Sequence, residues 1–323
     1  MRVGHVVVLA TGGTIASVPG EHGDYVASLG GRELVSRIGE AGAVRVETLF
    51  VKGSYAFTLE DLHTLAQAAI QYLDDSAIDG VVITQGTDTL EETSFYLALV
   101  LERRKPVALT GAQLPASDPQ GDGPRNLSQA IAVARDPEAA GWGPVVVFNG
   151  EIHAARDVRK VDTAALDAFK SPGWGPVGLV DRGRVIKARS VPERRVLPPA
   201  VPRPVALIRL AVGLTGDQVL QAAAGAAGVV LEAFGRGNAN PSVADAVRRL
   251  VDAGVPVVVT SRCVRGFVAP IYGDGGGRDL ERAGAWFAGD LAGEKARLLL
   301  GLLLAHGIRG EAAQEWLAEW AMS

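Results

Sequence analysis

Short apolar runs alternate with polar, glycine-rich turns along the first half of the chain. The runs at 6–9 and 81–84 contain no charged residue, which is typical of strands buried on both faces. Apolar residues at helical spacing follow several of the turns. The expected strands are 6–9, 44–51, 81–84, 107–110 and 145–149, and the expected helices are 33–39, 59–73 and 126–134. This alternation predicts an α/β fold with a larger N-terminal, doubly wound and mostly parallel sheet.

A proline-rich segment interrupts the alternation. It reads VPERRVLPPAVPRP and contains five prolines, which is typical of a semi-rigid linker. We therefore predict an N-terminal catalytic α/β domain at 1–190, a linker at 191–204 and a smaller C-terminal α/β domain at 205–323. In the last region we expect strands at 205–210, 228–234 and 255–260, and helices at 217–226, 242–252, 291–306 and 311–321.

Composition and charge exclude several classes of function. The chain has 323 residues, 48% hydrophobic content and a net charge of −4, which describes a globular protein. Its basic residues are scattered, so neither nucleic acid nor an anionic membrane is an expected partner. The apolar run near the N-terminus is interrupted by glycine too early for a signal segment or membrane span. Cys263 is the single cysteine, which fits a cytoplasmic protein without disulfides.

The chain lacks the sequence motifs of the common cofactor sites. Its 5 histidines are dispersed without metal-ligand spacing, so we expect no metal. The segment GRGNAN at 235–240 departs from the dinucleotide motif, and no Walker lysine follows the first glycine turn. No GxSxG motif of a serine hydrolase occurs either. We therefore expect no cofactor.

Two glycine-rich turns carry the candidate chemistry. The first strand runs into ATGGTIA, which contains Thr14, and the run at 81–84 leads into GTDTLEET, which contains Thr87 and Asp88. Paired glycines permit positive φ and let a ligand approach the backbone closely. At the carboxyl ends of parallel strands, side chains from such turns converge on one crevice.

Four ordered segments give the chain a specific resemblance. They are ATGGTIA, GTDTLEET, KPVALTGAQLPASDPQGDGPRNL and ARDVRK. Together they resemble the L-asparaginase family of amidohydrolases, and weaker similarity continues to the C-terminus. The resemblance implies hydrolysis of L-asparagine to L-aspartate and ammonia through an acyl-threonine intermediate.

The resemblance also assigns the residues of the acylation step. Thr14 matches the nucleophile, and it is a weak one without an adjacent base. Tyr25 lies in a polar, glycine-rich segment at 17–31 that we expect to be a mobile lid, and it matches the tyrosine that moves the nucleophile's proton. A purely structural role, in which Tyr25 anchors the loop, is the alternative.

A second group of residues is assigned to the water step and to substrate binding. Thr87, activated through Lys160 and Asp88, would position water, although an exposed, solvated lysine is the usual structural interpretation. Ser54 and Asp88 would hold the substrate's α-carboxylate and α-ammonium groups. The sequence departs from the family near this site, because Tyr55 replaces a frequent glutamine and a histidine is common where Gln85 stands.

The resemblance implies a homodimer or a dimer of dimers with active sites near the subunit interface. Asn238 would then be a substrate contact supplied in trans. The family's further glutamate has no secure match, and the candidates are Asp274, Asp279 and Glu281.

Other interpretations stay open at this point. The expected partner is a small amino-acid amide, so a glutaminase or another small-amide hydrolase is one alternative. The ammonia-producing subunit of a tRNA-dependent amidotransferase is a second alternative, although that subunit usually carries an extra N-terminal domain. Two further alternatives are not hydrolases: an amino-acid-binding regulator that has lost activity, and a nucleotide-binding protein.

The turn-forming residues Asp122, Gly123, Pro124 and Asn126 are expected to shape the wall of the site.

Overall fold

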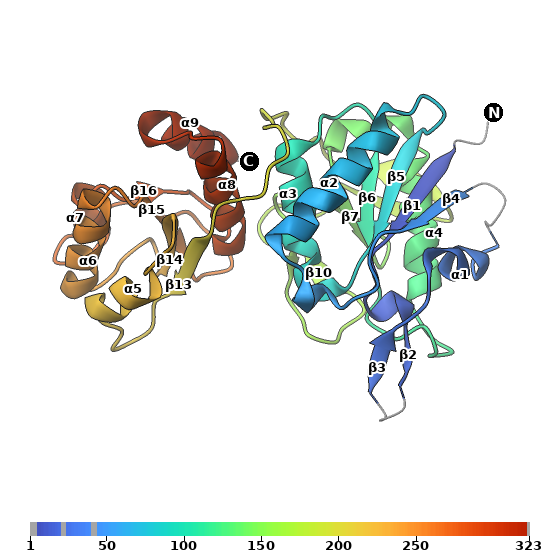
Figure 1. Ribbon diagram of the computed structural model, residues 1–323, viewed down its shortest axis with the longest axis horizontal. Coiled ribbons are helices and arrows are strands. Elements are labelled where there is room, and N and C mark those ends of the chain that lie inside the picture. The colour runs from blue at the N-terminus through green and yellow to red at the C-terminus, as the bar shows by residue number, and fades with distance from the viewer. Residues whose placement is uncertain (1–4, 21–23, 40–43, 322–323) are drawn as a thin grey trace. The chain divides into compact units, whose positions relative to one another are not determined.

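The computed structural model describes residues 5–20, 24–39 and 44–321, and it contains two compact units (Figure 1). The units are Met1–Pro199 and Ala200–Ser323. The residues from 188 to 204 form no helix or strand, and the boundary between the units falls within this stretch.

An eight-stranded sheet forms the centre of the described part of the N-terminal unit. Its strand order is β12-β11-β8-β7-β6-β5-β1-β4, and the five strands from β7 to β4 run parallel. Their bounds are Val6–Ala10 for β1, Val44–Thr48 for β4, Gly80–Thr84 for β5, Val107–Thr110 for β6 and Val145–Phe148 for β7. The antiparallel strands are β8 (Glu151–Ala154), β11 (Gly178–Asp181) and β12 (Arg184–Lys187). The predicted α/β fold with a mostly parallel N-terminal sheet is confirmed.

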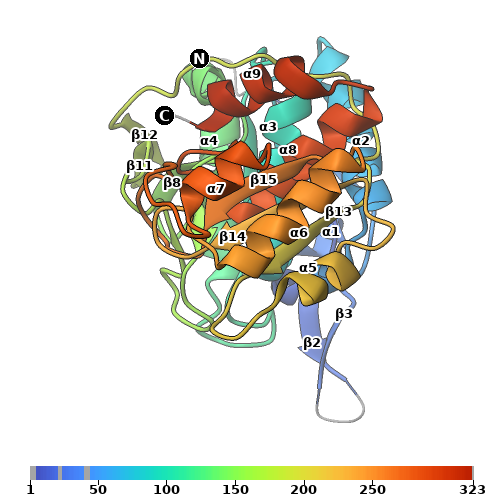
Figure 2. The ribbon, with the colours of Figure 1, turned by 90° about the vertical axis from the view of Figure 1, so that its left-hand side faces the viewer.

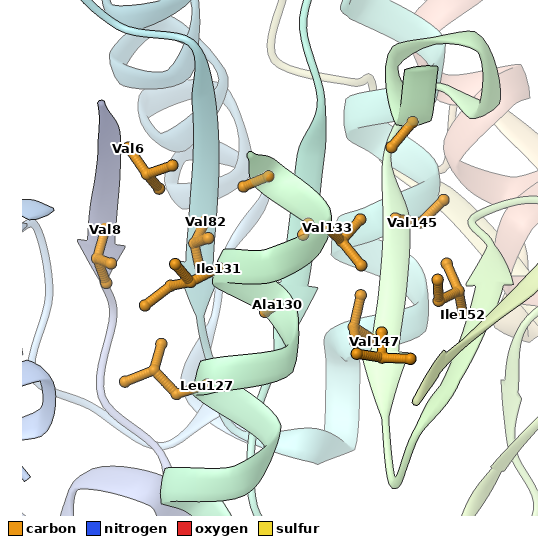
Figure 3. Close-up of a cluster of buried hydrophobic side chains, with 14 of the residues drawn as sticks. Val6, Val8, Val82, Leu127, Ala130, Ile131, Val133, Val145, Val147 and Ile152 are labelled. Atoms are coloured by element: carbon orange, nitrogen blue, oxygen red, sulfur yellow. The ribbon is translucent and has the colours of Figure 1, made fainter. Parts of the chain in front are cut away.

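Helices cover both faces of this sheet, which explains why its central strands are apolar without alternation. Helices α1 (Gly31–Ser36) and α4 (Gly123–Ala134) contribute to one buried cluster. In Figure 3, Leu127 and Ile131 of α4 lie beside Val8 of β1 and Val82 of β5. Helices α2 (Leu59–Asp74) and α3 (Leu90–Val100) cover the opposite face (Figure 1).

The order of the strands places a topological switch point at the carboxyl ends of β1 and β5. From β1 the chain moves to β4 on one side, and then returns past β1 to β5 on the other side. Open α/β sheets bind ligands at such a switch point.

Two successive crossovers differ in hand. The connection from β5 through α3 leads to the neighbouring strand β6, and the connection from β6 through α4 leads one strand further in the same direction, to β7. Helix α4, however, lies on the opposite face of the sheet from α3. The hand of the α4 crossover is therefore opposite to that of the preceding crossover.

Several predicted elements of the N-terminal unit differ in form or bounds from those found: the strand expected at 44–51 ends at Thr48, and the helix expected at 33–39 spans Gly31–Ser36. The segment 17–31, expected to be a mobile loop, contains a hairpin of β2 (Ser17–Pro19) and β3 (Tyr25–Ala27), whose register pairs Val18 with Val26. Residues 21–23 of the predicted lid lie outside the described residues. The helix expected at 126–134 begins earlier, at Gly123, because Pro124 suits the first turn of a helix.

The C-terminal unit has a smaller parallel sheet in the order β13-β14-β15-β16. The strands are Val205–Arg209, Gly228–Ala233, Val257–Ser261 and Trp286–Phe287. Helices α5 (Gly216–Ala222), α6 (Pro241–Asp252) and α7 (Gly277–Arg282) lie over one face (Figure 2). Helix α8 (Gly293–Ala305) packs on β13, β14 and β15, and α9 (Gly310–Ala321) contacts α8. The smaller C-terminal α/β domain is thus confirmed as a fold.

Within the described ranges, no helix is long and apolar enough to cross a membrane.

Candidate active site

Three short 3-10 helices, η1, η2 and η3, hold hydroxyl side chains beyond the carboxyl ends of β1, β4 and β5. They are Thr14–Ala16 (η1), Ser54–Ala56 (η2) and Thr87–Thr89 (η3). Because β1 lies between β4 and β5 in the sheet, the turns leave the same edge side by side. The predicted residues Thr14, Ser54 and Thr87 each begin one of these helices.

Glycine makes the close approach of the turns possible. Gly13 has φ 84°, and a Cβ on it would lie 2.2 Å from the backbone nitrogen of Gly86. A Cβ on Gly86 would in turn lie 2.7 Å from Ser54 Oγ. No other residue fits between these backbones. The structure thus brings the turn that carries Thr14 directly against the turn that carries Thr87.

Lys160, Thr87 and Asp88 form a hydrogen-bonded cluster. The Lys160 ammonium donates to Thr87 Oγ1 and to Asp88 Oδ1, both at 2.8 Å. The Lys160 side chain is 17% exposed, so it is mostly withdrawn from solvent, while Asp88 is 54% exposed. The backbone N–H of Lys160 donates to the Glu91 carboxylate in the first turn of α3. Lys160 is therefore a mostly buried, paired lysine and not an exposed, solvated one.

A short hairpin delivers Lys160 to this cluster. Lys160 lies in β9 (Arg159–Lys160) and pairs with Phe169 of β10 (Phe169–Lys170). Phe169 is 1% exposed, and its ring centroid lies 4.9 Å from that of Phe148 in β7. The burial of one aromatic residue in the sheet core thus fixes the strand that carries the lysine.

An ionic group lies behind this hairpin. The Glu151 carboxylate accepts a hydrogen bond from Lys170 Nζ at 3.1 Å, and His153 Nε2 lies 3.3 Å from it. His153 and Lys170 together lower the pKa of Glu151 to about 2, against the opposing effect of partial burial. His153 Nδ1 lies 3.0 Å from Ser171 Oγ. This group connects β8 to the end of β10, and no sequence motif indicated it.

Ser54 is 1% exposed and organises the neighbouring turn. Its hydroxyl oxygen accepts the backbone N–H of Asp88 at 3.1 Å, and its carbonyl oxygen accepts the Thr89 hydroxyl at 3.0 Å. Ser54 therefore joins η2 to η3, the turn that contains Thr87 and Asp88.

The two departures from the family pattern occupy different environments. Gln85 is fully buried, and its Nε2 donates to Thr89 Oγ1 at 3.1 Å and to Thr93 Oγ1 at 2.9 Å. Its Oε1 has no hydrogen-bond partner among the described residues. Tyr55 is 80% exposed, and its ring lies close to Gly53, where a Cβ would come within 2.4 Å of it. Gln85 therefore acts on the site through the threonines, whereas Tyr55 faces solvent.

Tyr25 is not joined to the cluster. It opens β3 opposite Pro19, and it is 61% exposed. Thr14 is half-buried in η1, and within the described ranges no hydrogen bond links it to Tyr25. The role of Tyr25 as a proton carrier thus stays a prediction.

Gln113 is a member of the site that sequence analysis missed. Thr87 Oγ1 donates to Gln113 Oε1 at 3.2 Å, and Gln113 Nε2 donates to the Ala165 carbonyl oxygen at 3.1 Å. The available signal was position: Gln113 follows the last residue of β6 by three residues, as Thr87 follows the last residue of β5. A polar side chain at that offset on an adjacent parallel strand points to the same crevice.

Asp122 has the structural role expected of a turn-forming residue. Its carboxylate is 3% exposed and accepts the backbone N–H groups of Gln113 and Leu114 at 3.0–3.1 Å. Asn126 Nδ2 donates to the same carboxylate at 2.9 Å. These bonds hold the wall of the site that Gln113 occupies.

In the C-terminal unit, Asn238 serves the local fold. Asn238 Oδ1 accepts the N–H of Gly277, the first residue of α7, at 3.2 Å. Satisfying a free N–H group at a helix start is the role of a cap. Its predicted contact with substrate in trans is a separate proposal.

The acidic candidates of that unit also have local roles. Asp279 accepts the Gly275 N–H at 2.7 Å and pairs with Arg282, and the bond to Gly275 contributes most to lowering its pKa. Glu281 pairs with Arg278 at 2.9 Å. Asp274 has φ 56°, a conformation that is uncommon for a residue with a side chain.

Comparisons with known proteins agree with the geometry. Residues 5–192 match the family model "Asparaginase, N-terminal", and residues 204–317 match "Glutaminase/Asparaginase C-terminal domain". A probable L-asparaginase from Deinococcus radiodurans is 38% identical over 319 residues, which cover 95% of this chain and 94% of that protein.

Two further relatives extend the comparison. A glutaminase-asparaginase from Pseudomonas fluorescens is 33% identical over 275 residues, covering 80% of this chain and 76% of the relative. A probable periplasmic L-asparaginase from Haemophilus influenzae is 32% identical over 344 residues, covering 98% and 93%. Both matched models and the extent of these similarities show that the chain belongs to the asparaginase family.

Proposed function

We propose that the protein hydrolyses L-asparagine to L-aspartate and ammonia through an acyl-threonine intermediate. The observation that carries the proposal is the Lys160–Thr87–Asp88 cluster, which lies in the turn packed against the Thr14 turn at the switch point of the sheet. The name of the D. radiodurans relative, probable L-asparaginase, supports asparagine as the substrate.

In the acylation step, Thr14 Oγ1 attacks the side-chain amide carbon of the substrate. The hydroxyl proton passes to the leaving nitrogen, with Tyr25 as the proposed carrier once its strand moves over the site. Backbone N–H groups at the η3 turn would hold the oxyanion of the tetrahedral intermediate. The C–N bond then breaks, ammonia leaves, and an aspartyl ester of Thr14 is formed.

In the deacylation step, water attacks the ester carbon. Thr87 holds the water, and the Lys160–Asp88 pair fixes the threonine hydroxyl. One proton of the water returns to Thr14 Oγ1 as the ester C–O bond breaks, and L-aspartate is released. Ser54 and Asp88 are proposed to bind the α-carboxylate and α-ammonium groups. The nucleophile and the proton carriers all come from the chain, so the proposal includes no cofactor.

L-Glutamine is the alternative substrate. The P. fluorescens relative carries glutaminase in its name, and Tyr55 and Gln85 depart from the family pattern beside the site. The buried Gln85 amide acts on Thr89, and Thr89 holds the Ser54 carbonyl oxygen. A change at position 85 therefore reaches the turn proposed to bind the α-carboxylate.

The proposal includes a homodimer or a dimer of dimers with active sites near the subunit interface, to which Asn238 would contribute in trans. It also includes a cytoplasmic location, supported by the single, exposed cysteine, Cys263. The H. influenzae relative is called periplasmic, so cell fractionation of the native host is the appropriate test of location.

The activity is tested by ammonia release from L-asparagine, L-glutamine, D-asparagine and a dipeptide amide. We expect L-asparagine to give the highest kcat/KM, with Thr14→Ala and Lys160→Ala both inactive while thermal unfolding stays cooperative. If no amide yields ammonia but L-asparagine or L-aspartate raises Tm, the protein is an amino-acid-binding regulator and the hydrolase proposal is wrong.

A further inference from the structure

The Gln113 side chain bridges Thr87 and the loop that joins β9 to β10. It lies 3.2 Å from Thr87 Oγ1 at one end and 3.1 Å from the Ala165 carbonyl oxygen at the other. The loop at Ala165 is itself ordered, because the backbone N–H groups of Ala164 and Ala165 both donate to Asp162 Oδ1 at 2.8 Å. Those two bonds lower the pKa of Asp162.

The chemistry of the partners fixes which end of the amide faces Thr87. A backbone carbonyl oxygen only accepts hydrogen bonds, so the Gln113 nitrogen must face Ala165. The amide oxygen then faces Thr87 and can only accept. The orientation of Gln113 thus follows from its contact with Ala165.

The partners of the Thr87 hydroxyl fix the direction of its hydrogen in the same way. Lys160, paired with Asp88, is an ammonium and donates to Thr87 Oγ1 at 2.8 Å. The Thr87 oxygen therefore accepts from Lys160, and its own hydrogen points to Gln113 Oε1. One lone pair of the hydroxyl oxygen remains for a ligand.

The backbone of Gln113 is held as firmly as its side chain. Its N–H lies 3.1 Å from both oxygens of the buried Asp122 carboxylate. A side chain that is fixed at its backbone and at both polar ends needs little further ordering during a reaction.

We propose that Gln113 is a positioning residue for the deacylation step, because it takes up the Thr87 hydroxyl hydrogen and leaves that oxygen as an acceptor for the hydrolytic water. Water that donates one hydrogen to Thr87 presents a lone pair of its oxygen to the ester carbon. This role rests on the proposed function, and it concerns the second chemical step only.

The first test is the steady-state and pre-steady-state kinetics of Gln113→Met with L-asparagine. Methionine has a similar length but only a weak acceptor, so the Thr87 hydrogen can turn toward the water. We expect deacylation to slow by about five- to tenfold, the effect of one lost hydrogen bond. With the acyl-enzyme accumulating, kcat and KM should fall together while kcat/KM stays unchanged, and ammonia should appear as a burst.

Two further variants separate this role from a general effect on folding. Gln113→Glu keeps an acceptor for the Thr87 hydrogen but loses the donor to the Ala165 carbonyl oxygen, so deacylation should slow less than in Gln113→Met without reaching the wild-type rate. Gln113→Asn keeps the amide on a side chain too short to reach Thr87, and it should show the burst. The matched control is Gln120→Met, because Gln120 is an exposed glutamine in the same segment and should leave both constants unchanged.

The outcomes distinguish this inference from the proposed function. If the wild-type protein releases no ammonia from L-asparagine, the proposed function fails. If the wild type is active and both Gln113→Met and Gln113→Asn match it, only the role of Gln113 is wrong. A fall in kcat/KM without a burst would place the defect in binding or acylation and would also overturn the inference.

Discussion

Both units contain parallel strands, yet the carboxyl ends of these strands differ in what they carry. In the N-terminal unit, β1 and β5 lead within a few residues into Thr14 and Thr87, and glycines bring these turns into contact. In the C-terminal unit, the turn after β14 directs Asn238 to the start of α7. The comparison teaches that a parallel sheet alone specifies no chemistry, which depends on hydroxyl groups and close backbones at its switch point.

The largest expected effect is a loss of kcat when the proposed nucleophile of the N-terminal unit is removed. Thr14→Ala removes the proposed nucleophile and should lower kcat with L-asparagine by at least about 10⁴-fold, as loss of a nucleophile does in other hydrolases. Its matched control is Thr215→Ala in the C-terminal unit, which removes the N-cap of α5 and leaves every proposed site residue intact. Equal losses in both variants would contradict the assignment of the chemistry to the N-terminal sheet.

A glycine pair tests whether the contact of the turns matters. Gly13→Ala combines φ 84° with a Cβ 2.2 Å from a backbone nitrogen, and it should lower the free energy of unfolding by about 3 kcal/mol. Gly307→Ala, at φ 71° with nothing within 4 Å, should cost only about 1 kcal/mol. Chemical denaturation measures both. Equal values would mean that strain in φ alone, without the steric clash, explains the need for glycine.

Asn238 tests the division between the units directly. Asn238→Ala leaves the Gly277 N–H without its acceptor and should cost about 1 kcal/mol of stability. Asn238→Asp keeps an acceptor and should retain most of that stability. If Asn238 also completes a site in trans, mixed and exchanged Thr14→Ala and Asn238→Ala subunits will regain activity that each variant lacks alone. No recovery after confirmed exchange would limit Asn238 to its capping role.

The smallest effect concerns pH and the group behind the Lys160 hairpin. The pKa of Glu151 is lowered from 4.5 to about 2 in the folded protein, so its stabilising contribution is present above about pH 4.5. That contribution is lost as the pH falls from 4.5 through 2. Glu151→Gln should remove this part of the acid dependence, about 1 kcal/mol after screening of a side chain that is 30% exposed.

Acid titration of unfolding in Glu151→Gln and in the exposed control Glu102→Gln measures the difference. An unchanged acid dependence in Glu151→Gln would mean that the contacts of Glu151 with His153 and Lys170 do not contribute to stability.

The sequence predicts the buried parallel strands because each contains a run of at least three consecutive apolar residues. The antiparallel strands β8, β11 and β12 escape prediction because EIHA, GLVD and RVIK are short and partly exposed. The hand of the α4 crossover could not be predicted either. The same amphipathic helix can pack on either face of a sheet that is apolar on both faces.

Some residues of the candidate site could likewise be predicted from the sequence, and others could not. Thr87 and Asp88 follow from the turn pattern, whereas the approach of Lys160 came only from the family resemblance. Its geometry depends on Phe169, a residue on the partner strand with no polar chemistry of its own. Gln113 was missed because its role exists only once Thr87 and Ala165 face it from other segments. Its position three residues beyond the end of β6 indicates the edge of the sheet where it lies, but not these two partners.

The central claim is that Thr14 carries the acyl group at the crevice between β1 and β5. The most direct test is mass spectrometry of peptides from enzyme quenched in acid during turnover of L-asparagine, using the Gln113→Met variant beside the wild type. The account predicts one added aspartyl group on the peptide that contains Thr14. An acyl group on the peptide that contains Thr87 would contradict it, and so would turnover of L-asparagine by a Thr14→Ala protein at the wild-type rate.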